Sequence, residues 1–159
     1  MREFTTRRLV PHTPSQMLEL VARVEEYPQF LPLCEALAVR TRTVEDGREV
    51  LVANMTAGYG AIHETFTSRV TIDRGAVPPH VLVEYLDGPF RHLENRWTFL
   101  PAPGGGCEID FFIRYEFKSM MLQVLVGAMF DKAFHRFTEA FEERARHVYG
   151  MPDRQTAEL

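Results

Sequence analysis

The chain has 159 residues, of which 45% are hydrophobic and 25% charged, and its formal net charge is −4 at pH 7. The acidic balance argues against tight binding of DNA, which depends on basic side chains that neutralise phosphates, and no apolar run reaches the ~20 residues of a membrane-spanning helix. Length and composition suit one globular domain, which we place at residues 1–150, followed by a flexible tail at 151–159.

The first predicted elements are a strand at residues 1–11 and a short helix after it. Thr13-Pro14-Ser15-Gln16 matches a capping box, with threonine at the N-cap, proline at the first helical position and glutamine at the third. Pro28 and Pro32 then break the chain into a compact bend, Tyr27-Pro28-Gln29-Phe30-Leu31-Pro32-Leu33-Cys34.

Alternation of apolar and polar residues and the turn signals between them predict six further strands, at residues 35–45, 49–57, 61–74, 80–87, 91–100 and 106–117. A helical pattern then runs from Ser119 to Tyr149, with Gly150 as its C-cap. The turns are too short for parallel crossovers. The order of elements therefore predicts an α+β domain, in which an antiparallel sheet carries its helices on one side.

Polar residues interrupt the apolar faces of two predicted strands. Glu64 and Ser68 share one face of strand 61–74, and Asn95 lies in line with the aromatic residues of strand 91–100. A curved sheet that closes on a long helix encloses a cavity, and ligand cavities are mostly apolar with a few placed polar groups. We expect such a cavity here, although Glu64 at its strand end could equally reach water.

The predicted C-terminal helix changes character along its length. Its downstream half has the usual apolar stripe with charged residues opposite, but its first three turns are apolar nearly all round. The apolar residues opposite the core stripe are Met121, Val124, Leu125 and Ala128. Such a surface must be covered by the chain itself, by a partner or by lipid. Burial under the protein's own loops or in a homodimer, and a membrane-touching lip at the cavity mouth, are the two interpretations.

Signals for catalysis, metal binding and secretion are weak. His63-Glu64 resembles the start of a zinc-protease motif, but residue 67 is threonine, and no metal site or catalytic residue is expected. The first residues, Met-Arg-Glu-Phe-Thr-Thr-Arg-Arg, lack the apolar segment of a signal peptide. We therefore expect the chain in a reducing cytoplasm, with Cys34 and Cys107 free and buried.

Several segments together resemble one known family. They are Val10-Pro11, Tyr27-Pro28-x-Phe30-Leu31-Pro32-x-Cys34, Glu64-Thr65-Phe66-Thr67-Ser68-Arg69-Val70, Asp87-Gly88-Pro89-Phe90-Arg91 and Trp97-x-Phe99. In this order they resemble the coenzyme Q-binding family of the START-like, polyketide cyclase/dehydrase-like superfamily, which also includes a bacterial ribosome-associating toxin. The similarity runs from about residue 3 to residue 150 without large gaps.

The resemblance implies a helix-grip fold, in which a curved antiparallel sheet wraps around the long C-terminal helix and leaves a hydrophobic tunnel. It also implies that the tunnel binds ubiquinone without a separate cofactor and without catalysis, supporting respiratory electron transport and quinone biosynthesis. A bacterial cytoplasmic protein, peripheral at the inner membrane, fits this role. The expected tunnel lining is Phe66, Trp97, Phe99, Phe111, Tyr115, Met129, Phe130 and Phe134, with Phe30, Leu31 and Phe90 near the mouth. The candidates for polar contacts are Glu64, Ser68, Arg69 and Asn95.

Two other functions are compatible with the same resemblance. One is that of the toxin-like relative, which binds the large ribosomal subunit and blocks subunit joining. The acidic balance disfavours it, because RNA-binding surfaces are usually basic, and Arg40, Arg42 and Arg48 form the single local basic cluster. The other is an aromatase/cyclase, for which Glu64 and Tyr115 could act as general acid and base.

Overall fold

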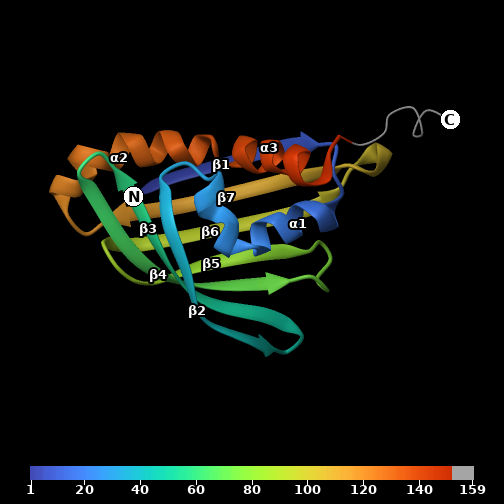
Figure 1. Ribbon diagram of the computed structural model, residues 1–159, viewed down its shortest axis with the longest axis horizontal. Helices are drawn as coiled ribbons and strands as arrows, with labels where there is room; N and C mark the ends of the chain where they lie inside the picture. The colour runs from blue at the N-terminus through green and yellow to red at the C-terminus, as the bar shows by residue number, and fades with distance from the viewer. Residues whose placement is uncertain (152–159) are drawn as a thin grey trace.

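The computed structural model describes residues 1–151, which form one antiparallel sheet with helices packed on one of its faces (Figure 1). The strands are β1 (Arg2–Val10), β2 (Cys34–Glu45), β3 (Arg48–Tyr59), β4 (Ile62–Asp73), β5 (His80–Asp87), β6 (Phe90–Pro101) and β7 (Cys107–Phe117). The α-helices are α1 (Pro14–Ala22), α2 (Met120–His135) and α3 (Phe137–Tyr149), and two 3-10 segments are η1 (Val24–Gln29) and η2 (Pro103–Gly105).

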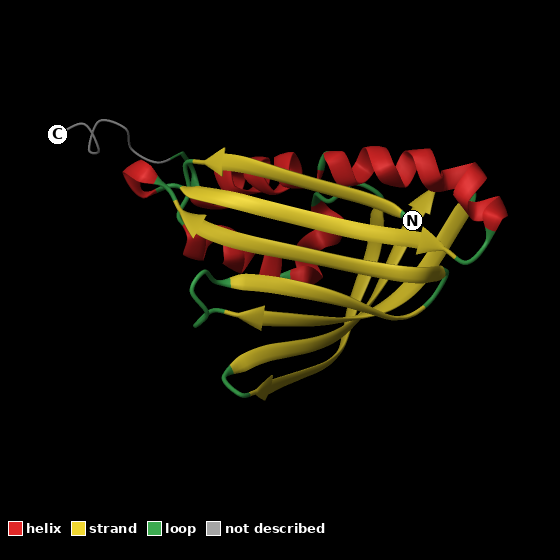
Figure 2. Ribbon diagram, turned by 180° about the vertical axis from the view of Figure 1, so that it is seen from behind, coloured by secondary structure: helices red, strands yellow, loops and turns green. Residues whose placement is uncertain are grey.

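The seven strands lie in the order β1-β7-β6-β5-β4-β3-β2. Every neighbouring pair from β2 to β7 is a hairpin of consecutive strands, whereas β1 pairs with the last strand, with Arg2 opposite Tyr115 and Val10 opposite Cys107. In the view from behind, the sheet is nearer to the viewer and the helices lie on its far face (Figure 2). The predicted α+β class with a helix-grip arrangement is therefore confirmed. Of the predicted tail, residues 152–159 lie outside the described part of the chain.

Local sequence signals account for the first helix and the first hairpin. The Thr13 hydroxyl accepts a hydrogen bond from the Gln16 backbone N–H, and the Gln16 side chain accepts one from the Thr13 N–H, which completes the predicted capping box. Asp46 and Gly47 both have positive φ, at 52° and 77°. This is the backbone that a two-residue turn between twisted strands requires.

The prediction of one continuous C-terminal helix is wrong. The helix is interrupted at Arg136, which separates α2 from α3. Arg136 has φ −100° and ψ −3°, and its N–H donates to the carbonyls of Ala133 and Phe134. Neither proline nor glycine marks the site, which is why the sequence pattern runs through it. The two helices that result pack on different elements: α2 packs on β7, and α3 packs on α1.

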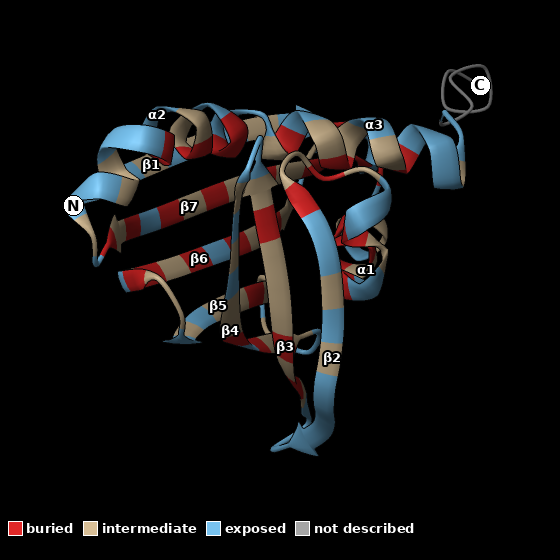
Figure 3. Cartoon of the chain, turned by 60° about the vertical axis from the view of Figure 1, so that its left-hand side comes forward, coloured by how far each residue is buried: buried red, intermediate tan, exposed pale blue. Residues whose placement is uncertain are grey.

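The core lies between the sheet and the helices, as the burial colours show (Figure 3). Strand β7 follows the predicted alternation: Cys107, Ile109 and Phe111 are buried, whereas the residues between them are partly exposed. Cys34 and Cys107 are both buried and free. Their placement agrees with the prediction of unpaired, buried thiols.

The turn between β5 and β6 contains a glycine that no other residue can replace without strain. Gly88 has φ +142°, and a Cβ at this position would lie 2.6 Å from Phe66 Cβ and 2.9 Å from its Cα. Gly88→Ala is therefore expected to lower the free energy of unfolding by about 2–4 kcal/mol, through an unfavourable backbone conformation and a clash with a neighbouring strand. Urea denaturation of this variant beside Gly75→Ala, where a Cβ meets nothing within 4 Å, measures the effect. An equal stability of the two variants would contradict the prediction.

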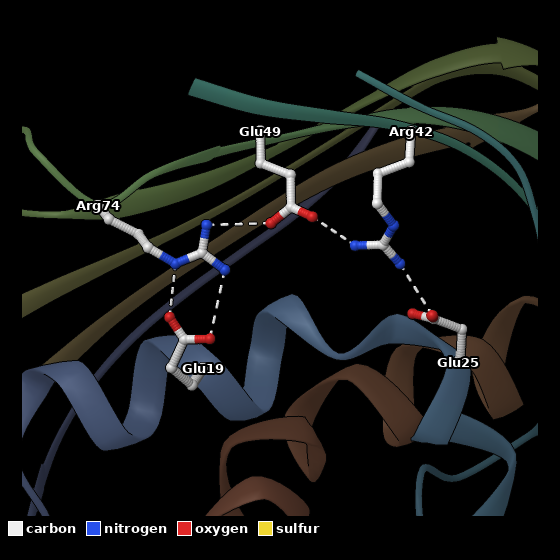
Figure 4. Close-up of polar contacts among 5 residues, drawn as sticks. All are labelled: Glu19, Glu25, Arg42, Glu49 and Arg74. Atoms are coloured by element: carbon white, nitrogen blue, oxygen red, sulfur yellow. Dashed lines mark hydrogen bonds and ion pairs between the residues drawn. The ribbon is translucent and has the colours of Figure 1, made fainter. Parts of the chain in front are cut away.

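A chain of ion pairs joins the sheet to α1 and η1 (Figure 4). Glu49 of β3 accepts from Arg42 of β2 and, at 3.0 Å, from Arg74. Arg74 in turn reaches Glu19 of α1, and Arg42 reaches Glu25 of η1 at 2.8 Å. Glu49 is the central member and only 16% of its side chain is exposed.

We expect Glu49→Gln to weaken the protein in a pH-dependent way. Desolvation would raise the pKa of the Glu49 carboxyl, but hydrogen bonds from Arg42 and Arg74 outweigh it and lower the pKa below its ordinary value of 4.5. The stabilisation is thus present above the unfolded-state pKa and is lost as pH falls through the lower folded-state value. Near pH 7 the variant should lose about 1–3 kcal/mol of unfolding free energy. Denaturation at pH 7 and pH 3.5, with exposed Glu84→Gln as the control, should show the difference from wild type shrinking in acid.

Candidate ligand-binding cavity

A cavity lies between the helix-covered face of the sheet, helices α2 and α3, and the bend that connects η1 to β2. The enclosed volume of this cavity is about 90 Å³. This is several times what one water molecule needs, and it is smaller than a typical small-molecule site. The enclosed space is thus large enough for a small apolar group rather than for a whole drug-sized ligand.

The cavity wall is apolar and carries no formal charge. Its polar side chains are Tyr27, Cys34, Ser68 and Asn95, and none of the described lining residues is acidic, basic or a histidine. Desolvation raises the pKa of the Cys34 thiol to about 11 and, with a smaller contribution from Cys34, raises the pKa of the Tyr27 hydroxyl as well. Both groups are therefore neutral near pH 7. Such a wall suits a neutral, largely apolar molecule rather than an ion.

Three of the four polar groups already have protein partners. The Tyr27 hydroxyl donates to the Val21 carbonyl, and the Cys34 thiol lies 3.8 Å from the Ala36 carbonyl. The Asn95 amide group donates to the Phe112 carbonyl at 2.9 Å, and its oxygen accepts from the Trp97 indole N–H at 2.8 Å. The Ser68 hydroxyl has no hydrogen-bond partner among the described residues, although the residue is only 6% exposed.

The structure brings about half of the predicted residues together around the cavity. Those in its lining are Leu31, Phe66, Ser68, Phe90, Asn95, Trp97, Phe130 and Phe134. Phe90 and Leu31, expected on loops near the mouth, are both buried, at 1% and 5% exposure. Contact of these residues with a ligand stays a prediction.

The other predicted lining residues lie outside the cavity. Phe99 and Phe111 are fully buried, and Phe111 packs against Phe137. The Tyr115 hydroxyl, at 3.3 Å from the Gly127 carbonyl, is directed at α2. Met129 is half-buried on α2. The sequence pattern shows which face these residues share but not how deep in the core each one lies.

The remaining candidates are at the protein surface or near it. Phe30 packs edge-on against Phe141, with its ring centroid 5.0 Å away, and lines an open surface depression beside α3. Arg69 is exposed, because it alternates with Ser68 and faces away from the helices. Glu64 is half-buried near the start of β4 and is not in the lining. Glu64 and Tyr115, considered for cyclase chemistry, therefore do not meet in the cavity.

Sequence reasoning missed the contribution of β2 and β3 to the wall. Leu37, Ala53, Met55 and Ala57 all line the cavity, and the last three share one face of β3 by simple alternation. Ala53 and Ala57 are small, so they leave room where larger residues would fill it. The alternation of Ala53, Met55 and Ala57 on one face of a predicted strand was the signal that could have found this wall.

The outer face of the first turns of α2 is apolar and exposed (Figure 3). Met120, Met121, Val124 and Leu125 have between 57% and 81% of their surface exposed, and Ala128 beside them is exposed too. We call these five residues the α2 apolar face. The two lysines of the sequence, Lys118 and Lys132, flank it and are also exposed. Within residues 1–151 no helix has both the length and the apolar character needed to cross a membrane.

Other polar surfaces are locally balanced in charge. Arg42 and Arg48 of the predicted basic cluster pair with Glu49, Glu25 and Asp73, so the β2–β3 hairpin is not a free basic patch. His63 pairs with Glu35 at 2.8 Å. Among the described residues, no three His, Cys, Asp or Glu side chains gather in a group that could hold a metal ion.

Comparison with known proteins identifies the family. The model of the polyketide cyclase/dehydrase and lipid transport family matches residues 10–142. The chain belongs to this family. Its fold is shared by the Zhui aromatase/cyclase of Streptomyces sp. R1128, with a TM-score of 0.75 and 15% identity over 92% of this chain and 95% of that one.

Two kinds of curated relatives resemble this family member along nearly all of its length. The ribosome association toxin RatA of Vibrio cholerae is 30% identical over 150 residues, covering 94% of this chain and 99% of the toxin. The mitochondrial coenzyme Q-binding protein COQ10 homolog B of Xenopus laevis is 29% identical over 156 residues, covering 95% of this chain and 61% of that protein. The chain is thus similar both to a protein named as a ribosome association toxin and to one named as a coenzyme Q-binding protein.

Proposed function

We propose that the chain is a non-catalytic carrier that binds ubiquinone or a related isoprenoid quinone in this cavity. The observation that carries the proposal is the uncharged, aromatic-rich wall with a few polar groups, which matches a neutral ring attached to an apolar tail. The relative named as a coenzyme Q-binding protein supports the same ligand class. In this role the chain supports respiratory electron transport and quinone biosynthesis by shielding the quinone from water.

The driving force for such binding is the removal of apolar surface from water. Each methylene-sized group of the tail that enters the cavity contributes roughly 0.8 kcal/mol. The aromatic rings of Phe66, Trp97 and Phe130 supply the contact surface. The tail beyond the first isoprene units has to leave through the opening, since the cavity holds only part of a long polyprenyl chain.

The α2 apolar face supplies the second half of the proposal, a transient contact with the membrane that stores the quinone. Single exposed apolar residues are ordinary, but a contiguous apolar face flanked by lysines is typical of surfaces that bind anionic lipid bilayers. Phe130 and Phe134, on the opposite side of the same helix, line the cavity. Membrane contact would therefore occur directly beside the ligand site.

Organic extraction and mass spectrometry of protein purified from its native host without detergent tests the proposal. Near-stoichiometric isoprenoid quinone would support the carrier and identify the tail length. Protein without any bound quinone, which also fails to take up a short-tail quinone added in vitro, would count against it.

A second candidate function is binding to the large ribosomal subunit, which blocks subunit association. It is favoured by the full-length similarity to proteins named as ribosome association toxins. The pairing of Arg42 and Arg48 with acidic side chains weighs against a basic RNA-binding surface at that hairpin. Sedimentation of the purified chain with separated ribosomal subunits distinguishes the two functions.

A further inference from the structure

The Ser68 hydroxyl is the one polar group of the cavity wall with no hydrogen-bond partner among residues 1–151. Ser68 lies on β4, where it is opposite Ala53 of β3 and Tyr85 of β5 in the sheet register. It is flanked on its own face by Phe66 and Val70, which also line the cavity. The neighbours of the Ser68 hydroxyl on its own strand face are therefore apolar.

An unpaired hydroxyl in such a place is unfavourable for folding. Leaving a buried polar group without a partner costs roughly 1–3 kcal/mol, and native proteins rarely keep such groups without a use. Asn95, on the same wall, shows the ordinary arrangement, since both ends of its amide have partners. Ser68 differs from Asn95 in that its polar group has no partner among the described residues.

We propose that Ser68 anchors the head group of the bound ligand by donating a hydrogen bond to a neutral oxygen, which in an isoprenoid quinone is a ring carbonyl. Ala53, opposite Ser68 in the sheet, has a small side chain and lines the same cavity. The uncharged lining excludes an anionic head group such as a phosphate, because no described lining residue could neutralise it. This inference rests on the proposed carrier function and specifies how the cavity selects its ligand.

The test compares two ligands with the same tail. One is a short-tail isoprenoid quinone, and the other is the matching isoprenoid hydrocarbon, which has no oxygen. Dissociation constants are measured for wild type and Ser68→Ala by the ligand-dependent rise in melting temperature. For the quinone, quenching of Trp97, the single tryptophan of the chain and part of the cavity wall, gives an independent measurement.

Ser68→Ala is expected to weaken binding of the quinone about tenfold, because the buried carbonyl loses its donor. Binding of the hydrocarbon should stay the same or become tighter. The melting temperature of the ligand-free variant should stay at or above that of wild type, because no protein hydrogen bond is removed. Val70→Ala is the matched control, since it removes apolar wall on the same strand and should weaken both ligands alike.

Each outcome decides a different point. Equal loss of quinone and hydrocarbon in Ser68→Ala, or no loss of either, overturns the anchor but leaves the carrier function intact. A lower melting temperature of the ligand-free variant without a change in ligand preference assigns the hydroxyl a structural role, and also overturns the anchor. If wild type binds neither the quinone nor the hydrocarbon, the carrier function and the anchor are overturned together.

Discussion

Trp97→Ala is expected to lower the amount of isoprenoid quinone that co-purifies with each mole of folded protein by about tenfold. Trp97 is 2% exposed, lines the cavity and packs edge-on against Phe111 and Phe141 at centroid distances of 4.7 and 4.9 Å. Its removal takes away one wall of the site and leaves Asn95 Oδ1 without its indole donor. We also expect a loss of about 3–5 kcal/mol in unfolding free energy from the missing ring.

Phe99→Ala separates the effect on binding from the effect on stability. Phe99 is fully buried on the same face of β6 but lies outside the cavity lining, so its truncation should destabilise the fold by a similar amount. Quinone per mole of monodisperse protein should then stay near the wild-type value. An equal loss of quinone from both variants would show that stability, not the Trp97 wall, controls the yield.

The double variant Val124→Glu/Leu125→Glu is expected to bind lipid vesicles at least about tenfold more weakly than wild type, since two apolar side chains of the α2 apolar face become charged. The measurement is co-sedimentation with vesicles of phosphatidylcholine and anionic phosphatidylglycerol. Because both positions are exposed, the thermal stability should change little. Binding should also weaken at high salt, through screening of Lys118 and Lys132.

Leu9→Glu/Val44→Glu is the matched control for the vesicle experiment. Leu9 and Val44 are 70% and 76% exposed, similar to the residues of the α2 apolar face, but they lie on β1 and β2. This control should bind vesicles as wild type does. If it loses binding to the same extent, net charge and not the α2 apolar face determines the interaction; if neither variant loses binding, the membrane contact is refuted.

The sequence predicts most of the fold because its signals are local. The observed strands begin and end within two residues of the predicted ones, since alternation and turn residues are properties of short segments. The break at Arg136 is different, because it depends on how α2 and α3 pack on separate supports and has no sequence signal of its own.

The cavity was predicted only in part for a related reason. Alternation tells that Phe66, Trp97 and Phe111 face the helices, but depth along the sheet decides that the first two line the cavity and the third fills the core. The state of the Ser68 hydroxyl depends on what surrounds it in three dimensions. Residue type and position predict that both Ser68 and Asn95 face the cavity. They do not predict that Asn95 has hydrogen-bond partners, Trp97 and the Phe112 carbonyl, while Ser68 has none among the described residues.

The pairing of β1 with β7 has a consequence for synthesis of the chain. The strand that is translated first must wait for its partner, Cys107–Phe117, which is translated roughly a hundred residues later. During that interval β1 has unpaired backbone groups and could associate with other nascent chains. Its outward-facing arginine, Arg7, is the kind of charge that prevents such aggregation. We therefore expect the closing of the β1–β7 ladder to come late in folding.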